Sequence, residues 1–306
     1  MRKAYILVNL GAPEDFSKGA AERFLREFLS DKHVISLPYP FRKLLAFYIS
    51  KARGARYAES LKQIALNGKH PLLHYTQSLA RKVAAKSGVP TFAAFRYGND
   101  SVESAVDKAR SCGANKFRFI PMYPQSALST SVSAKRRITR AMRRGDDCKI
   151  LPHYFDNPLY ISALSNSLRN AAADADCAVA SFHSVPLSHL EDSPYREQCE
   201  KTAELIGRKS GMKEVKVAWQ SRMGRGSWLG PSAEEVGKSF AQSKGGRIAV
   251  ICPGFSCDCT ETLLEIGRDL RASCMACGAK DFKCVPCLND SDAHAEMFCE
   301  LFERMK

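Results

Sequence analysis

The sequence contains no apolar run long enough to cross a membrane. A membrane-spanning helix needs roughly 20 consecutive apolar residues, and no stretch of this 306-residue chain approaches that length. Near the N-terminus, the apolar run Tyr5–Val8 is too short for the core of a signal peptide, and Asn9–Pro13 interrupts it. We therefore expect a cytoplasmic protein whose membrane contact is at most peripheral, on the inner face.

The sequence also lacks the common signatures of nucleic-acid binding. It has no zinc-finger histidine pair, no aromatic RNA-binding motif and no long Lys/Arg tract. Its 46 Lys and Arg residues nevertheless exceed its 32 Asp and Glu residues, which gives a formal net charge of +14. This excess favours an anionic partner. We expect anionic lipid or a substrate that carries carboxylates, and the sequence leaves the oligomeric state open.

Twelve cysteines without a secretory signal favour reduced thiols over a disulfide scaffold. Four of them form two CxxC pairs, Cys274 with Cys277 and Cys284 with Cys287. Four thiolates at this spacing suit a tetrahedral zinc, a rubredoxin-like iron or a two-iron two-sulfur cluster. The spacing therefore predicts a metal site and leaves its occupant open.

Short apolar runs alternate with longer amphipathic segments, which is the pattern of a parallel sheet covered by helices. The predicted strands are Ala4–Asn9, Pro90–Phe95, Lys116–Pro121, Ala178–His183, Glu214–Trp219 and Arg247–Pro253. The predicted helices include Ala20–Leu29, Gln77–Ser87, Ser101–Ser111, Pro158–Ala171, Arg196–Ser210, Ser232–Ser243 and Glu261–Arg271. The pattern predicts the α/β class.

The strand and helix series runs twice, with a join near Asp156–Pro158. One sheet with so many units would be unusually wide, so we predict two doubly wound, Rossmann-like lobes. The first lobe is placed at residues 1–157, joined by a C-terminal helix at 291–306. The second lobe is placed at 158–290 and contains the Cys-rich loop 274–287. A cleft between two lobes is the default ligand site.

One histidine stands at the predicted end of a strand. His183 closes the apolar run Ala178–His183, and functional side chains of α/β proteins gather at the C-terminal ends of strands. There, histidine can accept a proton near neutral pH or bind a metal ion. A hydrogen-bonded structural histidine is the alternative.

A row of carboxylates follows another apolar strand. On the predicted helix, Asp258, Glu261, Glu265 and Asp269 share one side. Such a row suits a hydrated divalent cation that must be passed along and released. The alternative is a solvated face on which Arg268 and Arg271 neutralise the acids.

An apolar helical face is predicted near residue 45. Phe41, Leu45 and Tyr48 lie on one side, which Leu44 and Phe47 widen, and cations follow. This face suits a membrane interface or the mouth of an apolar ligand site. A helix packed on its own core is the alternative.

The motifs resemble those of ferrochelatases along nearly the whole chain. The matching landmarks, in order, are Leu7–Pro13, Phe24–Leu25 to Phe28–Leu29 with Asp31, Pro71–Leu72 before Thr76, Phe95–Tyr97, Pro121–Gln125, Ser181–Pro186, Tyr195, Trp219–Arg222, Trp228–Pro231 and Asp258–Glu265. The resemblance implies an enzyme of the chelatase type that inserts ferrous iron, its substrate, into a porphyrin to form heme.

The resemblance also implies positions in the site. His183 and Glu261 are expected to oppose each other across the macrocycle. The other expected pocket residues are Asn9, Arg96, Tyr97, Gln220, Ser221 and Trp228, and Leu10, Tyr123 and Trp228 are candidates for an apolar wall. Arg96 could anchor a porphyrin propionate, and a salt bridge between elements is its alternative role.

Metal insertion releases two pyrrole protons, so the site needs a base on one face and a metal donor on the other. We assign proton acceptance with early iron coordination to His183. We assign the opposite acidic path to Glu261 with Glu265 and Asp258. Cys259 departs from the histidine that many family members carry there, and a thiolate would bind iron more tightly than imidazole.

Some ferrochelatases carry an iron–sulfur cluster, which makes a 2Fe-2S cluster our preferred occupant of the CxxC pairs, with zinc as the alternative. Protoporphyrin IX is the expected substrate, and coproporphyrin is not excluded. Two other functions stay open: a cobalt or nickel chelatase that acts on another tetrapyrrole, and a non-catalytic heme or metal carrier.

Overall fold

The computed structural model describes residues 2–191, 193–212, 215–222 and 226–305. The chain divides into two units. The first comprises residues 1–122, 128–152 and 298–306, and the second comprises residues 123–127 and 153–297. Within the described range, each unit is built on one four-stranded sheet.

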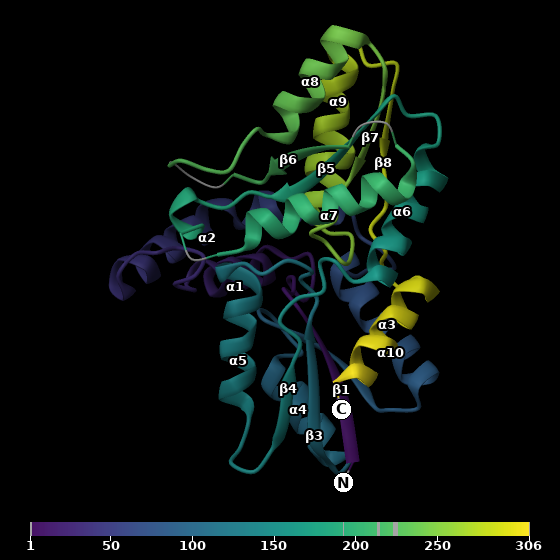
Figure 1. Ribbon diagram of the computed structural model, residues 1–306. Helices are drawn as coiled ribbons and strands as arrows, with labels where there is room; N and C mark the ends of the chain where they lie inside the picture. The colour runs from purple at the N-terminus through teal and green to yellow at the C-terminus, as the bar shows by residue number, and fades with distance from the viewer. Residues whose placement is uncertain (1, 192, 213–214, 223–225, 306) are drawn as a thin grey trace. The chain divides into compact units, whose positions relative to one another are not determined.

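The sheet of the first unit is fully parallel (Figure 1). Its strands are β1 (Arg2–Asn9), β2 (Thr91–Phe95), β3 (Ala114–Pro121) and β4 (Asp147–Ile150), in the order β2-β1-β3-β4. The order changes direction at β1, the first strand in the sequence. Parallel neighbours require crossover connections, and helices supply them.

Side-chain alternation along the strands gives this sheet two apolar faces. Tyr5 in β1 stacks on Phe302 in α10 (Asp292–Arg304), with ring centroids 4.1 Å apart. Phe117 in β3 faces the other side, where Arg110 of α4 (Val102–Ser111) lies 5.3 Å from its ring centroid. Because both faces are covered, β1 reads as a continuous apolar run, as expected of a parallel strand.

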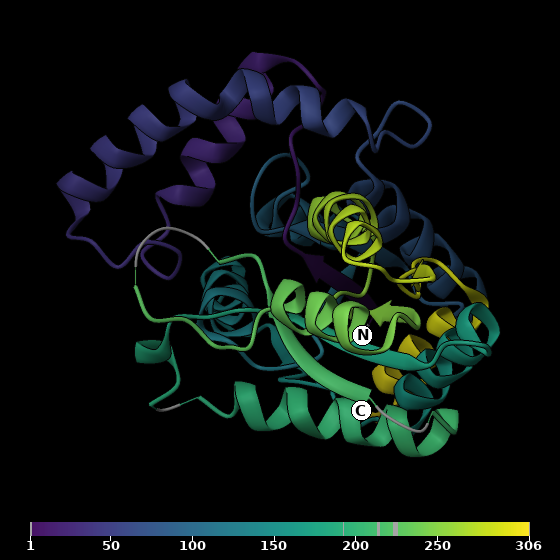
Figure 2. The same ribbon diagram turned by 90° about the horizontal axis from the view of Figure 1, so that it is seen from above.

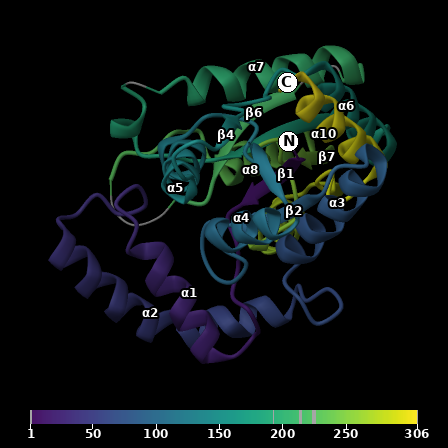
Figure 3. The same ribbon diagram turned by 90° about the horizontal axis from the view of Figure 1, so that it is seen from below.

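Helices α1 (Lys18–Leu29) and α2 (Tyr39–Lys62) lie side by side (Figure 2). Gly54 permits their close approach, because a Cβ there would lie 2.5 Å from Cγ of Glu22. Lys51 of α2 also forms an ion pair with Glu22, at 2.5 Å. Helices α3 (Pro71–Ser87) and α4 lie beside β2 (Figure 3). A π-helical turn, η1 (Leu128–Val132), leads into α5 (Ser133–Ala141).

The second unit repeats this architecture. Its strands are β5 (Cys177–His183), β6 (Val215–Gln220), β7 (Arg247–Ile251) and β8 (Asp281–Cys284), all parallel, in the order β6-β5-β7-β8. Its helices are α6 (Pro158–Ala172), the short 3-10 turn η2 (Leu187–His189), α7 (Tyr195–Ser210), α8 (Ala233–Lys244), the π-helix η3 (Glu261–Leu270) and α9 (Arg271–Ala276).

The alternation of side chains in β5 decides which groups reach the functional edge. Val179 belongs to the core formed with α8, η3 and α9. Phe182 faces the other side, where it packs against Trp219, which in turn contacts Tyr195 of α7. Because side chains alternate with a period of two, His183 is directed to the same side as Val179, toward η3.

The predicted α/β class is confirmed, and all six predicted strands are present with small shifts at their ends. Glu214, the predicted first residue of one strand, lies outside the described residues. The prediction missed β4 and β8, and it began α3 too late. Helix α3 starts at Pro71, where His70 accepts the Leu72 amide at 3.2 Å. Proline at the first helical position loses no helical hydrogen bond.

Candidate functional site

His183 ends β5, and its imidazole orientation is fixed by the backbone. Its Nδ1 lies 2.6 Å from the carbonyl oxygen of Ser184. Because a carbonyl oxygen only accepts, Nδ1 carries the hydrogen, and the lone pair of the neutral ring lies on Nε2. The hydroxyl of Tyr195 donates to the carbonyl oxygen of His183 at 2.8 Å, which holds the end of the strand from α7.

Gln220 connects the end of β6 to the start of η3. It stands opposite His183 in the parallel register. Its Oε1 accepts from the Ser181 hydroxyl at 2.6 Å, and its Nε2 donates to the carbonyl oxygen of Glu261 at 3.2 Å. The strand register and this hydrogen bond therefore place His183 and Glu261 at the same edge of the second sheet, and Gln220 connects their backbones.

Glu265, one turn along η3, is held by Ser221. Its carboxylate accepts from the Ser221 amide at 2.6 Å and from the Ser221 hydroxyl at 2.5 Å. Ser221 has φ of +63°, a left-handed conformation that costs a non-glycine residue energy and is often found at functional sites. The expected pocket residue Ser221 thus positions an acid of the carboxylate row.

Burial raises the pKa of Glu265 above its ordinary value. The Ser221 hydrogen bonds and the nearby His183 oppose this rise in the pKa of Glu265, whereas the charge of Glu261 adds to it. The three side chains therefore interact electrostatically at one edge of the sheet. Glu265 takes up a proton more readily than an exposed glutamate does.

Asp258 stands apart from the predicted carboxylate row, because η3 begins only at Glu261. Its Oδ1 accepts from the Thr262 hydroxyl at 3.0 Å and from the Cys287 amide at 3.3 Å. Its Oδ2 accepts from Asn289 Nδ2 at 2.6 Å. Asp269, at the far end of the row, is exposed and forms an ion pair with Arg268, as the alternative interpretation expected. These contacts divide the row, and they leave Glu265 as the acid whose pKa responds to the charges of His183 and Glu261.

Cys259 is buried next to Glu261, and burial raises the pKa of its thiol well above the ordinary value. A neutral thiol is a weak metal ligand. Without a bound metal, Cys259 is therefore a neutral thiol, and its role as an iron ligand stays a prediction.

The four CxxC cysteines belong to two neighbouring elements of the second unit and the segments that follow them. Cys274 and Cys277 lie in and just after α9, before β8 begins, whereas Cys284 ends β8 and Cys287 follows it. Cys274 packs against α8, where a Cβ on Gly237 would lie 2.7 Å from its sulfur, and the Cys284 thiol donates to the Thr262 carbonyl at 3.7 Å. A zinc ion needs its sulfur ligands about 2.3 Å away. Among the described residues these thiols are not arranged as a ready-made metal site, so the cluster, with zinc as its alternative, stays a prediction.

Across the described ranges, no group of three or more His, Cys, Asp or Glu side chains is arranged to hold a metal ion. The expected iron path through His183, Glu261, Asp258 and Glu265 is therefore not visible as a ready-made coordination shell. Iron is the substrate of the expected reaction, and the CxxC pairs are where a resident metal was predicted.

Two expected pocket residues, Trp228 and Tyr123, belong to the second unit, where Trp228 is partly buried and Tyr123 is buried. Trp228 forms an isolated bridge with Pro186, beside the loop that follows His183. Its indole Nε1–H is buried, and within the described residues it has no hydrogen-bond partner. A buried donor of this kind is available to a ligand. Tyr123 is buried at the start of the unit.

The expected pocket residues of the first unit form their own network. Arg96 forms an ion pair with Asp31 and lies 4.7 Å from the ring centroid of Tyr97. The Tyr97 hydroxyl donates to Asp31 at 2.8 Å. For Arg96 the structure thus shows the salt bridge that was the alternative to a propionate anchor.

Asn9 is also occupied locally. Its side chain donates to the Thr76 hydroxyl at 3.0 Å and accepts from the Leu10 amide at 2.8 Å. Asn9 thus fixes the turn after β1 and presents the partly buried Leu10 next to it.

Comparison with known proteins decides the family. The family model described as Ferrochelatase matches residues 2–306. The chain belongs to the ferrochelatase family. Named ferrochelatases from Photobacterium profundum and from Rhodopseudomonas palustris (strain BisB5) are 31% and 34% identical to it. The alignments cover 97% and 95% of this chain, and 95% and 89% of the relatives.

Solved structures confirm the fold. SirB from Bacillus subtilis with Fe3+ superposes with a TM-score of 0.61 at 12% identity, over 99% of this chain and 95% of SirB. At that identity the similarity concerns the fold alone. Ferrochelatase membership makes the chain a porphyrin metal chelatase, a lyase that forms heme from ferrous iron and a porphyrin.

Sequence reasoning missed several residues that hold the site. Ser181 and Tyr195 were noted only as landmarks, yet they fix Gln220 and the end of β5. Thr262 and Asn289, which hold Asp258, were not singled out. Their partners are 4 to 39 residues away in sequence, so spacing alone carries no signal for these contacts.

Proposed function

We propose that His183 is the base that removes pyrrole protons from the porphyrin and the first donor to the incoming iron. The observation that carries this proposal is the hydrogen bond from His183 Nδ1 to the Ser184 carbonyl, which leaves Nε2 as the basic nitrogen. A neutral imidazole accepts a proton near neutral pH without prior activation.

Glu261 and Glu265 form the acidic side of the site in this proposal. Carboxylates bind hydrated ferrous iron while its waters remain exchangeable. The raised pKa of Glu265, which burial causes, also suits it to accept a proton released nearby. We assign to Asp258 the positioning of the loop before η3, because three hydrogen bonds already occupy its oxygens.

We propose protoporphyrin IX as the porphyrin. The indole of Trp228 is a candidate to contact the ring, and its buried Nε1–H, which has no partner among the described residues, is available to a polar substituent. The net charge of +14 favours a substrate with carboxylate side chains. Coproporphyrin, which carries more of them, is the comparison substrate.

The test is anaerobic metallation by the full chain with ferrous iron and each porphyrin, followed by the heme absorption bands. We expect the wild type to form heme and His183→Ala to lose at least about a hundredfold in turnover, the usual effect of a removed general base. His189→Ala removes a histidine from the neighbouring turn η2 and should leave turnover near wild type.

The variants need a folding control, which porphyrin binding followed by fluorescence provides. Equal turnover of His183→Ala and wild type would rule out the role of His183. Binding of porphyrin without metallation by the wild type would favour a carrier, and preference for cobalt or nickel over iron would favour another chelatase activity.

We also propose that α2 docks on the surface of an anionic membrane. One alternative was that the apolar side chains of α2 pack on the core of the protein. The structure contradicts this for the largest of them, because Tyr39, Phe41, Leu44 and Tyr48 are 55–64% exposed. Arg42, Lys43 and Arg53 on the same helix add positive charge beside them. This combination is typical of a helix that lies in a lipid interface. None of the described helices is both long and apolar enough to span a bilayer.

A further inference from the structure

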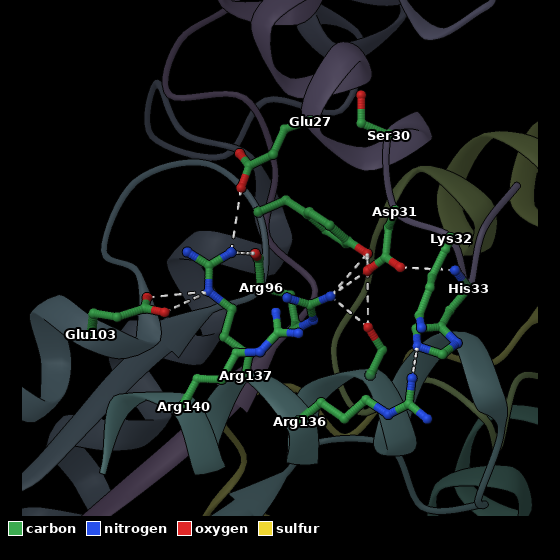
Figure 4. A pocket seen from close by; sticks show the side chains of 12 residues that line it. Glu27, Ser30, Asp31, Lys32, His33, Arg96, Glu103, Arg136, Arg137 and Arg140 are labelled. Atoms are coloured by element: carbon green, nitrogen blue, oxygen red, sulfur yellow. Dashed lines mark hydrogen bonds and ion pairs between the residues drawn. The ribbon is translucent and has the colours of Figure 1, made fainter. Parts of the chain in front are cut away.

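The first unit contains a cavity of about 410 Å³ between the end of α1, the end of β2 and α5 (Figure 4). We call it the α1–α5 cavity. Lys32 and His33 enter it from the loop after α1, Arg96 from the end of β2, and Arg136 and Arg140 from α5. It belongs entirely to the first unit, whereas His183, Glu261 and Glu265 belong to the second.

Positive charge dominates the lining of the α1–α5 cavity. Five cations and three carboxylates line it. The carboxylates are already engaged: Asp31 pairs with Arg96, while Glu103 and Glu27 pair with Arg137 at 3.0 and 3.5 Å. Lys32, Arg136 and Arg140 have no carboxylate partner in the described part of the chain. The cavity therefore holds three cationic side chains whose charge no carboxylate of the described residues neutralises.

An adjoining hollow extends this excess of charge. Lys32, Arg136 and Arg140 also line a more open cavity of about 640 Å³, which Lys135 joins and to which no carboxylate contributes. Arg136 and Arg140 stand four residues apart on α5, so their guanidinium groups lie on one face of the helix. Like charges at this spacing repel, which an anion between them relieves.

Arg96 and Arg136 both carry donors that an anion in the α1–α5 cavity could use. Arg96 is 8% exposed, and its Nε is buried without a hydrogen-bond partner in the described residues. Arg136 Nη1 lies 2.7 Å from His33 Nε2. Because guanidinium only donates, His33 accepts through Nε2 and must be neutral in this contact. An anion in the cavity could accept from Arg96 Nε and from the remaining N–H groups of Arg136.

The surroundings of His33 favour the neutral imidazole that its contact with Arg136 requires. Burial lowers the pKa of His33, and the charges of Arg136 on α5, Lys32 on the same loop and Arg96 at the end of β2 lower it further. Only Asp31 opposes them. An added anion would raise the pKa of His33, so binding would be coupled to proton uptake.

We propose that the α1–α5 cavity binds a tetrahedral oxyanion, the phosphate group of a small metabolite or of a lipid headgroup. Guanidinium groups match the geometry of such an anion with paired hydrogen bonds, and Lys32 adds a point charge. The volume accommodates the phosphate and a small organic substituent. The cavity shares Arg96 and Tyr97 with the expected porphyrin pocket, but it contains none of His183, Glu261 and Glu265, so the proposal does not depend on the roles assigned to those three residues.

The experiment is calorimetric titration of the full chain with sulfate and with pyrophosphate at low ionic strength. We expect saturable binding that the double variant Arg136→Gln/Arg140→Gln weakens by at least about tenfold, because two charge-assisted contacts are lost. The matched control Arg143→Gln/Arg144→Gln removes the same charge just beyond α5, outside both cavities, and should bind as wild type.

Sulfate also tests the coupling to His33, because it does not titrate near neutral pH. Its affinity should rise as the pH falls from about 8 to 6, and His33→Gln should remove this dependence. Equal affinities of the two double variants, or binding that does not saturate, would overturn the proposal.

A second arm identifies the source of the phosphate. Vesicles of phosphatidylcholine with phosphatidic acid are added during the sulfate titration. If the vesicles displace sulfate from the wild type, a lipid headgroup is the source. If sulfate binding persists unchanged while pyrophosphate displaces it, the ligand is a soluble phosphorylated molecule.

Discussion

At the scale of single residues, Ser221 is the clearest case of a side chain that positions an acid. Its amide and hydroxyl both donate to Glu265, and its backbone adopts φ of +63° to do so. Hydrogen bonds to a carboxylate favour its charged form. Ser221 therefore limits the rise in the pKa of Glu265 that burial causes.

Replacing Ser221 by Ala or Gly should raise the pKa of Glu265 further, because both variants lose the hydroxyl donor. If turnover requires ionised Glu265, the acid limb of the pH profile of turnover shifts to higher pH in both variants. Ser221→Gly also removes the backbone strain, so it should be more stable than Ser221→Ala by about 1 kcal/mol. Turnover over a pH series and urea unfolding measure the two effects. Unchanged acid limbs would contradict the positioning role.

The sequence predicted the residue types of this site better than their tasks. His183 and Glu261 follow apolar strands, and α/β topology brings strand ends to one edge, so their placement was predictable. The tasks of Asp258 and Arg96 were not. They depend on Asn289 and Asp31, which are 31 and 65 residues away, and a single sequence carries no sign of such contacts.

At the scale of elements, η3 is a π-helix, wound more widely than an α-helix, and it begins at Glu261, after Asp258. The helical period predicted one face for all four acids, but Asp258 precedes the element and turns toward Asn289. π-helical segments are rare and are often found at functional sites. The edge strands β4 and β8 were missed for a different reason: each has four residues, and polar side chains such as Asp147 and Asp281 interrupt the apolar pattern.

The start of α10 supports this loop through His294. His294 is fully buried, and its Nδ1 donates to the carbonyl oxygen of Asn289 at 2.6 Å. Asn289 in turn holds Asp258. Burial lowers the pKa of His294 to about 4. Acid pH therefore destabilises the loop that contains Asp258 and Asn289, because it protonates His294.

Because of His294, the free energy of unfolding should decrease as the pH falls. Its folded pKa is below that of the unfolded chain, about 6.5, so the unfolded state takes up the proton first as the pH falls. The loss begins below about pH 6.5 and reaches up to about 3 kcal/mol near pH 4. His294→Gln should flatten this dependence in urea unfolding, whereas His153→Gln at an exposed position should not. Parallel curves for wild type and His294→Gln would refute the assignment.

At the scale of the whole molecule, positive charge and exposed apolar side chains coincide on the first unit. Both the α1–α5 cavity and the face of α2 belong to it. The sequence predicted the apolar face from its helical spacing, and the structure shows which side chains are exposed. The free cations of the cavity could not be predicted, because composition does not tell which charges are paired.

Membrane binding should depend on the apolar face of α2. Phe41→Ser/Tyr48→Ser should reduce partition to vesicles of phosphatidylcholine and phosphatidylglycerol by at least about tenfold, since each side chain contributes more than about 1 kcal/mol when it enters an apolar phase. Leu159→Ser/Met275→Ser removes two exposed apolar side chains of the second unit as a control. Vesicle flotation measures the partition, and equal losses in both double variants would argue against docking through α2.

The C-terminal end of α10 has a further consequence for the order of folding during synthesis. Phe302 stacks on Tyr5, and the carbonyl oxygen of Met305 accepts from Arg118 at 2.6 Å, so the first sheet is completed by residues made after the whole second unit. On the ribosome, residues 153–297 emerge as a full set before the first unit has its last partners. We therefore expect the first unit to complete its packing only after the residues of the second unit have been synthesised.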